Sequence, residues 1–196
     1  MCKRGISMPT GPLEFKVASE PAEFEQIHRL NYQTFVEEIP QHPPNPERRL
    51  VDKFHADNTY LIAQQGAWVV GMLALRDRRP FSLDAKLTDL DAWLPPHRAL
   101  CEVRLLAVRP SHRGPHVLQG LLTLVADVGK QRGYDLAVIS GTVRQLKLYG
   151  ALGFAPFGPL VGVGEAVFQP MYLTLAAYQS NRAWCHTLAP DTRRSS

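Results

Sequence analysis

Apolar and polar residues recur along the chain with two periods, one typical of strands and one typical of helices. Short stretches rich in Val, Leu and Ile predict strands at residues 14–18, 59–63, 67–75, 101–108, 136–140, 165–168 and 171–175. Apolar residues three and four apart predict helices at residues 20–38, 117–132 and 143–152. Because strands and helices alternate, with one strand pair reading as a hairpin, we expect an α/β fold whose sheet is partly antiparallel.

The first predicted helix has a clear start and a clear end. Ser19 is the expected N-cap, and Pro21 suits the first helical turn. The apolar face consists of Phe24, Ile27, Leu30, Tyr32, Phe35 and Val36. The segment PQHPPNP at residues 40–46 ends the helix, since proline lacks a backbone donor and clashes with the preceding turn.

The stretch from Cys101 to Leu118 is the part around which we expect the protein to be organised. The strand at 101–108 stops at Arg109-Pro110, and a short basic turn leads into the helix at 117–132, for which Gly133 is a good C-cap. A strand that enters a helix through such a turn leaves backbone N–H groups free at the helix N-terminus. The stretch therefore predicts a phosphate site.

A long irregular segment at residues 76–99 precedes this strand. It starts with basic residues, contains a short helical pattern at 84–93 and ends at Pro95 and Pro96. Long excursions in compact domains are often functional. We therefore expect this one to shape an acceptor pocket.

Two further turns are predicted near the end of the chain. Gly141 and Thr142 form a turn after the strand at 136–140, and Gly153 ends the helix that follows. We expect a loose lead-in at residues 1–13, one domain at 14–188 and a polar tail at 189–196.

Composition and charge narrow the class of protein. The chain has 196 residues, of which 45% are hydrophobic and 20% are charged, as in a globular domain with a full core. The net charge of +4 favours an acidic partner or a phosphorylated ligand, although ordinary surface charge explains it equally well. The basic residues are scattered without interleaved aromatics, so nucleic-acid binding is a weak alternative.

The cysteines and histidines predict neither a disulfide framework nor a metal site. The three cysteines, Cys2, Cys101 and Cys185, lack redox or metal spacing, and the seven histidines lack zinc spacing. A buried strand thiol explains Cys101 better than a nucleophile does. With no apolar signal core near the start and no apolar run longer than 67–75, we expect a cytoplasmic protein without a transmembrane segment.

Two motifs resemble the GNAT superfamily of acyltransferases. The first is LLAVRPSHRG at residues 105–114, which is similar to the family's strand-four and pyrophosphate-loop segment. The second is LYGALGF at residues 148–154, similar to the family segment Leu-Tyr-x-x-Leu-Gly-Phe. The resemblance implies a GNAT-type mixed, partly antiparallel central sheet with helices on both faces, and an acyl thioester donor.

The resemblance also implies where the donor binds. The pantetheine arm would pair with the backbone of Leu106, Ala107 and Val108, where the family splays two strands apart. The pyrophosphate would take backbone N–H groups between Arg113 and Leu118. The residues expected to bind the donor are Leu106, Ala107, Val108, Arg113, Gly114, His116, Val117 and Leu118.

The turn departs from the usual Arg/Gln-Gly-x-Gly-x-Gly/Ala pattern, because only Gly114 is kept. Pro115 removes a donor, and His116 and Leu118 replace glycines that allow close approach to phosphate. His116 could compensate when protonated, or be a plain loop histidine, and Arg113 could bind phosphate or simply be solvated.

Part of the chain is similar to a GNAT branch that uses acyl carrier proteins, the N-acyl amino acid synthases and, more remotely, the autoinducer synthases. The matching residues are the segment YQTFVEE at 32–38, Asp52, Arg76 and Glu102-Val103-Arg104. In that branch the acyl chain sits on the phosphopantetheine of an acidic carrier protein, so the altered turn and the basic charge suit it. The donor is therefore either acyl-CoA, including acetyl-CoA, or acyl carrier protein.

Amide formation from a thioester needs a base for the amine and an acid for the thiolate. Glu102 is the candidate base, because a carboxylate inside an apolar strand is unusual. Glu102 and Arg104 share a face of the strand, so a structural ion pair is the alternative. Arg104 and Arg76 are the candidate substrate-binding residues.

By family position, Tyr149 is the candidate acid and the backbone N–H of Leu106 is the candidate oxyanion donor. A packing role on an amphipathic helix is the alternative for Tyr149.

The sequence therefore predicts an N-acyltransferase that moves an acyl group directly from a thioester to a small amine, such as an amino acid. A donor-binding module without turnover is one alternative, and the altered turn favours it. Acyl-homoserine-lactone synthesis is another, ranked lower because that family has an early aromatic nucleotide pocket and no tryptophan precedes Trp68 here.

Overall fold

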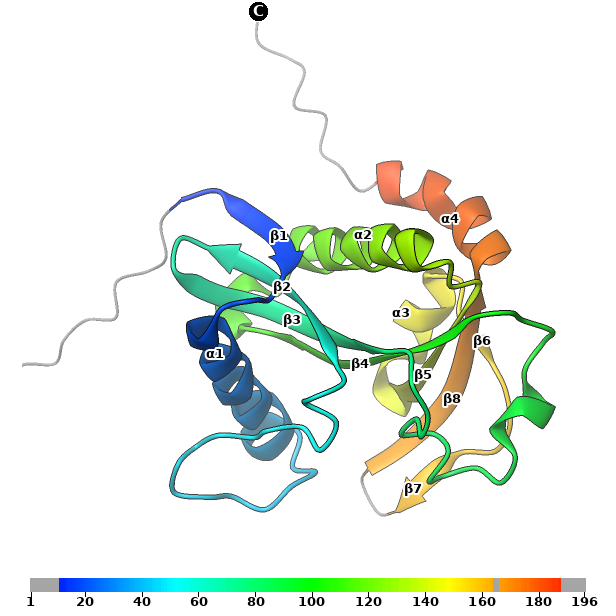
Figure 1. The fold of residues 1–196 in the computed structure, drawn as a ribbon, viewed down its shortest axis with the longest axis horizontal. Coiled ribbons are helices and arrows are strands. Elements are labelled where there is room, and N and C mark those ends of the chain that lie inside the picture. The colour runs from blue at the N-terminus through cyan, green and yellow to red at the C-terminus, as the bar shows by residue number, and fades with distance from the viewer. Residues whose placement is uncertain (1–10, 164–165, 188–196) are drawn as a thin grey trace, which may run out of the picture. The chain divides into compact units, whose positions relative to one another are not determined.

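The computed structural model describes residues 11–163 and 166–187, so most of the predicted lead-in, the tail and Glu165 lie outside the described residues. The strands are β1 Leu13–Val17, β2 Thr59–Gln65, β3 Trp68–Arg76, β4 Leu100–Val108, β5 Leu136–Thr142, β6 Ala155–Pro156, β7 Val161–Val163 and β8 Ala166–Thr174. The α-helices are α1 Pro21–Tyr32, α2 Pro115–Arg132, α3 Leu146–Ala151 and α4 Leu175–Thr187 (Figure 1). A π-helix, η1 Gln33–Glu38, continues α1, and short 3-10 turns are η2 Leu90–Trp93, η3 Pro110–His112 and η4 Val143–Gln145.

The strands follow the order β1-β2-β3-β4-β5-β8-β6, and β7 pairs with β8. The β4–β5 pair is parallel, with α2 as its crossover, whereas β1–β2, β5–β8, β6–β8 and β7–β8 are antiparallel. The predicted α/β class with a mixed, partly antiparallel sheet is confirmed.

The described chain forms two compact units. The first contains residues up to Ala74 and Leu105–Leu124, and the second contains Leu75–Arg104 and residues from Val125 onward. The chain passes between the units within β3, β4 and α2.

In the first unit, helices cover both faces of the strands. Ile27 and Leu30 of α1 share a core cluster with Tyr60 and Ile62 of β2 and Met72 of β3. Successive residues of a strand point to opposite faces, and a Cβ on Gly71 would lie 2.8 Å from Val117 Cγ1 of α2. A Cβ on Gly120 would lie 2.0 Å from the Phe15 ring of β1, so glycine lets β1 pack closely against α2.

In the second unit, β5 lies between β4 and β8 and supports two apolar clusters (Figure 1). One cluster joins the 76–99 segment to the sheet through Phe81, Leu83 and Val138, among others. The other packs α3 on β5 and β8 around Ile139, Phe154 and Met171. The irregular segment is thus packed onto the sheet by its apolar side chains.

Several predicted boundaries were wrong. The N-cap of α1 is Glu20, and Ser19 instead donates its backbone N–H to Glu23, 2.9 Å away. Gly141 and Thr142 belong to β5, because they pair with Gln169 and Phe168 of β8. The predicted helix at 143–152 is a 3-10 turn followed by the shorter α3.

Three other differences concern the irregular segment and the C-terminal part. The helical pattern at 84–93 gives only the 3-10 turn Leu90–Trp93. The final strands at 165–168 and 171–175 correspond to the single strand β8, and β7 and α4 were not predicted. No helix within the described ranges is both long and apolar enough to cross a membrane.

Candidate functional site

The candidate site residues fall in both units. Arg76, Glu102, Arg104 and Tyr149 belong to the second unit, and the donor-binding candidates from Leu106 to Leu118 belong to the first.

Strand β4 leaves its parallel partner half-way along its length. The β4–β5 register ends at Glu102 opposite Val138, whereas β5 continues to Thr142 in pairing with β8. Leu105 then adopts φ +56, a left-handed conformation that is a true outlier for a bulky side chain. Such strained backbone costs about 1–3 kcal/mol and clusters at functional sites. The break lies one residue before Leu106, the candidate oxyanion donor.

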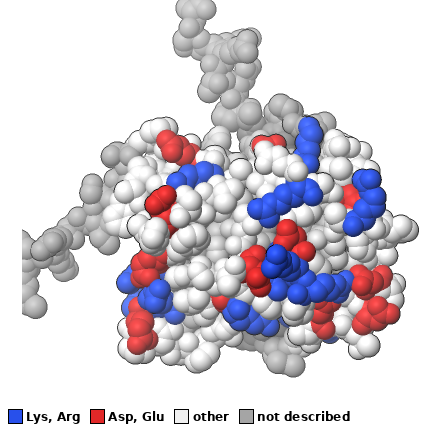
Figure 2. All heavy atoms as spheres, viewed as in Figure 1, with Lys and Arg blue, Asp and Glu red and all other residues white. Residues whose placement is uncertain are grey.

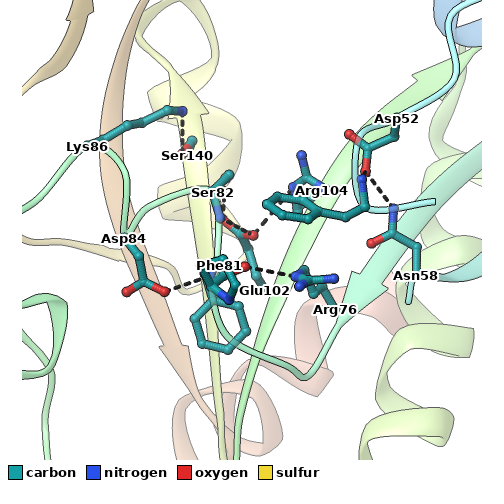
Figure 3. Close-up of polar contacts among 12 residues, drawn as sticks. Asp52, Asn58, Arg76, Phe81, Ser82, Asp84, Lys86, Glu102, Arg104 and Ser140 are labelled. Atoms are coloured by element: carbon teal, nitrogen blue, oxygen red, sulfur yellow. Dashed lines mark hydrogen bonds and ion pairs between the residues drawn. The ribbon is translucent and has the colours of Figure 1, made fainter. Parts of the chain in front are cut away.

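Glu102 is completely buried, with 0% exposure, and both of its carboxylate oxygens are engaged. The Ser82 backbone N–H donates to Oε2 over 2.8 Å, the Ser82 hydroxyl donates to Oε1, and Arg104 Nε lies 3.4 Å from Oε2 (Figure 3). The arrangement holds the irregular segment at Ser82.

Arg76 anchors the same part of the irregular segment. Its side chain is buried, and its Nε donates to the Pro80 carbonyl oxygen over 2.9 Å (Figure 3). Glu102 and Arg76 therefore hold Ser82 and Pro80, two residues apart. The structure brings three predicted site residues, Arg76, Glu102 and Arg104, to this short stretch of the irregular segment.

Tyr149 packs its ring against β5. A Cβ on Gly141 would lie 2.9 Å from the ring, and Phe154 contacts it edge-on at a centroid distance of 6.4 Å. Burial raises the pKa of the Tyr149 hydroxyl, and hydrogen bonding to Thr142 opposes this only in part. The phenol therefore stays protonated at neutral pH and can donate.

The basic turn leads directly into α2, which begins at Pro115 and not at Val117. The N–H groups of His116, Val117 and Leu118 thus lie in the first helical turn, where the helix itself supplies no acceptor. No heavy atom of the described chain lies within 4 Å of where a Gly114 side chain would begin, so the backbone there is open to a ligand. These groups fit a phosphate or a phosphopantetheine arm.

Arg113 is engaged within the protein. Its Nε donates to the Val108 carbonyl oxygen over 3.0 Å, and its Nη2 forms an ion pair with Glu38 of η1. Part of its charge is therefore neutralised, so a phosphate would compete with Glu38 for this guanidinium.

Sequence reasoning missed the role of Ser82, because nothing local marks a serine in an irregular segment as the partner of a carboxylate 20 residues away. It also missed Asp135, which accepts from the backbone N–H groups of Arg98 (3.1 Å) and Ala99 (2.9 Å) and ends the same segment. Asp52, named for its resemblance alone, closes the turn before β2 by accepting from Phe54 N (3.1 Å) and Asn58 Nδ2 (2.7 Å) (Figure 3).

Cys101 and the surface charges point to no further chemistry. Burial raises the pKa of the Cys101 thiol to about 12, so it is no nucleophile at neutral pH. Among the described residues, no group of His, Cys, Asp and Glu side chains could hold a metal ion. On the face drawn in Figure 2, basic and acidic side chains are interspersed.

Comparison with known proteins gives the family. A sequence model of the N-acyl amino acid synthase FeeM family matches residues 26–176, which is most of the chain and contains both motifs. No curated protein sequence matches.

Solved structures share the fold. FeeM, an N-acyl amino acid synthase from uncultured soil microbes, has 20% identity and a TM-score of 0.71 over 92% of this chain and 100% of that one. The CoA-dependent acyl-homoserine lactone synthase BjaI, solved with MTA, has 22% identity and a TM-score of 0.74 over 91% and 92%. An acyl-CoA N-acyltransferase from Pseudomonas aeruginosa has 15% identity and a TM-score of 0.58 over 82% and 99%.

The family match covers the strand, the basic turn and the Tyr149 helix in one continuous span, and the mixed sheet agrees with it. The chain therefore belongs to the N-acyl amino acid synthase FeeM family and is a GNAT-like acyltransferase that transfers an acyl group to an amine.

Proposed function

We propose that this acyltransferase forms N-acyl amino acids from an acyl thioester of phosphopantetheine, carried by CoA or by an acyl carrier protein. The observation that supports the proposal best is the end of the β4–β5 pairing at Glu102, followed by the left-handed Leu105. A strand that leaves its neighbour frees backbone groups with which an extended pantetheine arm can pair. Leu106, Ala107 and Val108 would provide those groups.

The phosphate end of the donor would bind at the start of α2. The backbone of Gly114 and the N–H groups of His116, Val117 and Leu118 would hold it, with Arg113 reaching it after release from Glu38. With a carrier protein as donor only one phosphate needs a place, which suits a turn that has a single glycine.

The reaction would proceed by direct transfer. The amine nitrogen attacks the thioester carbonyl carbon, and the N–H of Leu106 stabilises the oxyanion. The C–S bond then breaks, Tyr149 protonates the thiolate, and Glu102 receives the proton of the amine, directly or through water. The products are an amide and a free thiol.

Arg76 and Arg104 would bind the acceptor on the side of the irregular segment. Both are held near Glu102, and a guanidinium matches the carboxylate of an amino acid.

The test is thiol release from mixtures of protein, acyl-CoA or acyl carrier protein, and a panel of amino acids, with the amide identified by mass spectrometry. Thiol and N-acyl amino acid in equal amounts would support the proposal. Hydrolysis alone, or no thiol above background across acyl chain lengths, would contradict it.

A binding experiment distinguishes CoA from an acyl carrier protein as the carrier of the acyl group. Native electrophoresis compares the complexes with CoA and with an acyl carrier protein. Tight CoA binding would exclude the preference for a carrier protein.

The role of Tyr149 is tested by Tyr149→Phe, which keeps the ring packing and removes the hydroxyl. We expect turnover to fall by about 10²-fold or more, as for loss of a general acid, with donor binding nearly unchanged. Equal turnover in both proteins would remove Tyr149 as the acid.

A further inference from the structure

Three buried polar side chains of the first helix have polar atoms without a hydrogen-bond partner in the described chain. We call His28, Asn31 and Thr34 the buried polar row; they follow one another at helical spacing and are 4%, 0% and 6% exposed. Within residues 11–163 and 166–187, nothing hydrogen-bonds to His28 Nδ1, to either amide atom of Asn31 or to Thr34 Oγ1. A buried polar atom without a partner is costly, and it often marks the place of a water or a ligand.

The row lies beside the strand that is proposed to hold the donor. Leu30 and Phe35, the sequence neighbours of Asn31 and Thr34, pack in the apolar cluster of the first unit. That cluster also contains Ala107 and, at its margin, the left-handed Leu105 of β4. The row and the donor strand therefore belong to one packed region of the first unit.

The helix is irregular where the row ends. Thr34 is part of the π-helix η1, in which the Ile39 N–H donates to the Thr34 carbonyl oxygen five residues back, over 2.9 Å. Single π-turns are rare and occur often at functional sites. The row is closed to solvent in this structure, so an acceptor can reach it only when η1 or a neighbouring element moves.

The row carries no charge. Asn31 and Thr34 are neutral, and burial, with the nearby His55 and Arg49, lowers the pKa of His28, so its ring is neutral above pH 6.5. A thioester is attacked by an amine only in its uncharged form. A carboxylate in this place would stabilise the ammonium form, whereas amide and hydroxyl groups do not.

We propose that Asn31 and Thr34 bind the acceptor as a neutral primary amine with an oxygen close to the amino group. Asn31 Oδ1 and Thr34 Oγ1 accept the amine N–H groups, and Asn31 Nδ2 donates to the neighbouring oxygen. This rests on the proposed function and assigns residues that recognise its amino-acid acceptor. Amines without that oxygen should be poor acceptors.

Steady-state kinetics on Asn31→Leu and Thr34→Val test this, with the exposed Thr123→Val of α2 as the matched control. We expect the KM for the amino acid to rise at least 10-fold in each variant, with the KM for the thioester within twofold. Asn31→Leu should also weaken the preference for an amino acid over the matching amine that lacks the carboxylate, and Arg76 and Arg104 should retain the rest of that preference. Unchanged amino-acid KM values in both variants would overturn the proposal.

A pH profile separates binding from a structural role. Asn31→Asp places a carboxylate against the amine, so the acidic limb of kcat should move to higher pH as the bound amine becomes harder to deprotonate. A wild-type profile in an active Asn31→Asp protein would contradict amine contact at this position. This conservative variant and Thr34→Ser keep the proposal testable if the apolar variants fail to fold.

Experiments can contradict the proposed function and the proposed role of the buried polar row independently. A wild-type protein that transfers to no amine would overturn the proposed function. Thermal shift by amino acids would then test the row alone. A shift in the wild type that Asn31→Leu abolishes supports the row, and a shift retained in the variant, or absent from the wild type, overturns it.

Discussion

Two regions of this protein bury polar side chains, one with hydrogen-bond partners for them and the other without. Glu102 on β4 is fully enclosed, and both of its oxygens are satisfied by Ser82 and Arg104. Asn31 and Thr34 on the first helix are also buried, yet their side-chain polar atoms have no hydrogen-bond partner in the described part of the chain.

The difference teaches what each region is for. A satisfied buried carboxylate stabilises the fold around it, here by holding the irregular segment at Ser82, whatever else it does in catalysis. The unpaired polar atoms of the buried polar row do not stabilise the free protein. We therefore attribute them to binding of the acceptor. Stability and activity should therefore respond oppositely in the two regions.

The largest effect is expected from Glu102→Gln. Glu102→Gln removes the negative charge of a buried ion pair, so unfolding should become easier by about 3 kcal/mol. Urea denaturation measures this, with the exposed Glu14→Gln as the control, expected within about 0.5 kcal/mol of wild type. A loss below about 1 kcal/mol would show that Glu102 does not hold the segment.

A smaller effect is expected from Ser82→Ala, which removes the hydroxyl bond to Glu102 and keeps the backbone one. The cost should be about 1–2 kcal/mol, since the lost bond goes to a charged acceptor. In the double variant with Glu102→Gln the two losses should not add, because both act on one contact. Additive losses would mean that Ser82 acts independently of Glu102.

The acid sensitivity of the row gives the next prediction, tested by His28→Phe. Burial lowers the pKa of His28 in the folded state, so the unfolded chain binds the proton more readily. The stability of the wild type should thus be intact above pH 6.5 and should fall as the pH drops from 6.5 towards the folded pKa. Denaturation between pH 5 and 8 should show a shallower fall in His28→Phe, and equal slopes would contradict the burial effect.

The smallest change, and of opposite sign, is expected from Thr34→Val. This near-isosteric substitution removes a buried hydroxyl without a partner in the described chain, so stability should stay level or rise by up to about 1 kcal/mol. Urea denaturation of Thr34→Val and Ser82→Ala compares the changes in unfolding free energy of the two variants. A clear destabilisation by Thr34→Val would mean that the hydroxyl is satisfied in the free protein.

Much of the fold could be predicted from local patterns. The apolar face of the first helix is buried through Ile27 and Leu30, and the strand at 101–108 ends at its proline as expected. Predictions were wrong where pairing with a distant strand decides the conformation: Gly141 looks like a turn residue, but full-length pairing with β8 keeps it extended. Helix α4 was missed, although Thr174 caps it by accepting a hydrogen bond from the Ala177 backbone N–H over 3.1 Å.

By itself, the sequence determined the order of the elements, the basic turn and the Tyr149 segment, because periodicity and turn chemistry act over a few residues. Only the tertiary structure decided what Glu102, Arg113 and Asn31 do. Glu102 contacts a serine 20 residues away and Arg113 contacts Glu38, 75 residues away, whereas Asn31 contacts no polar partner in the described ranges. Whether a buried polar group is satisfied depends on residues that the fold brings together, and no local pattern contains that information.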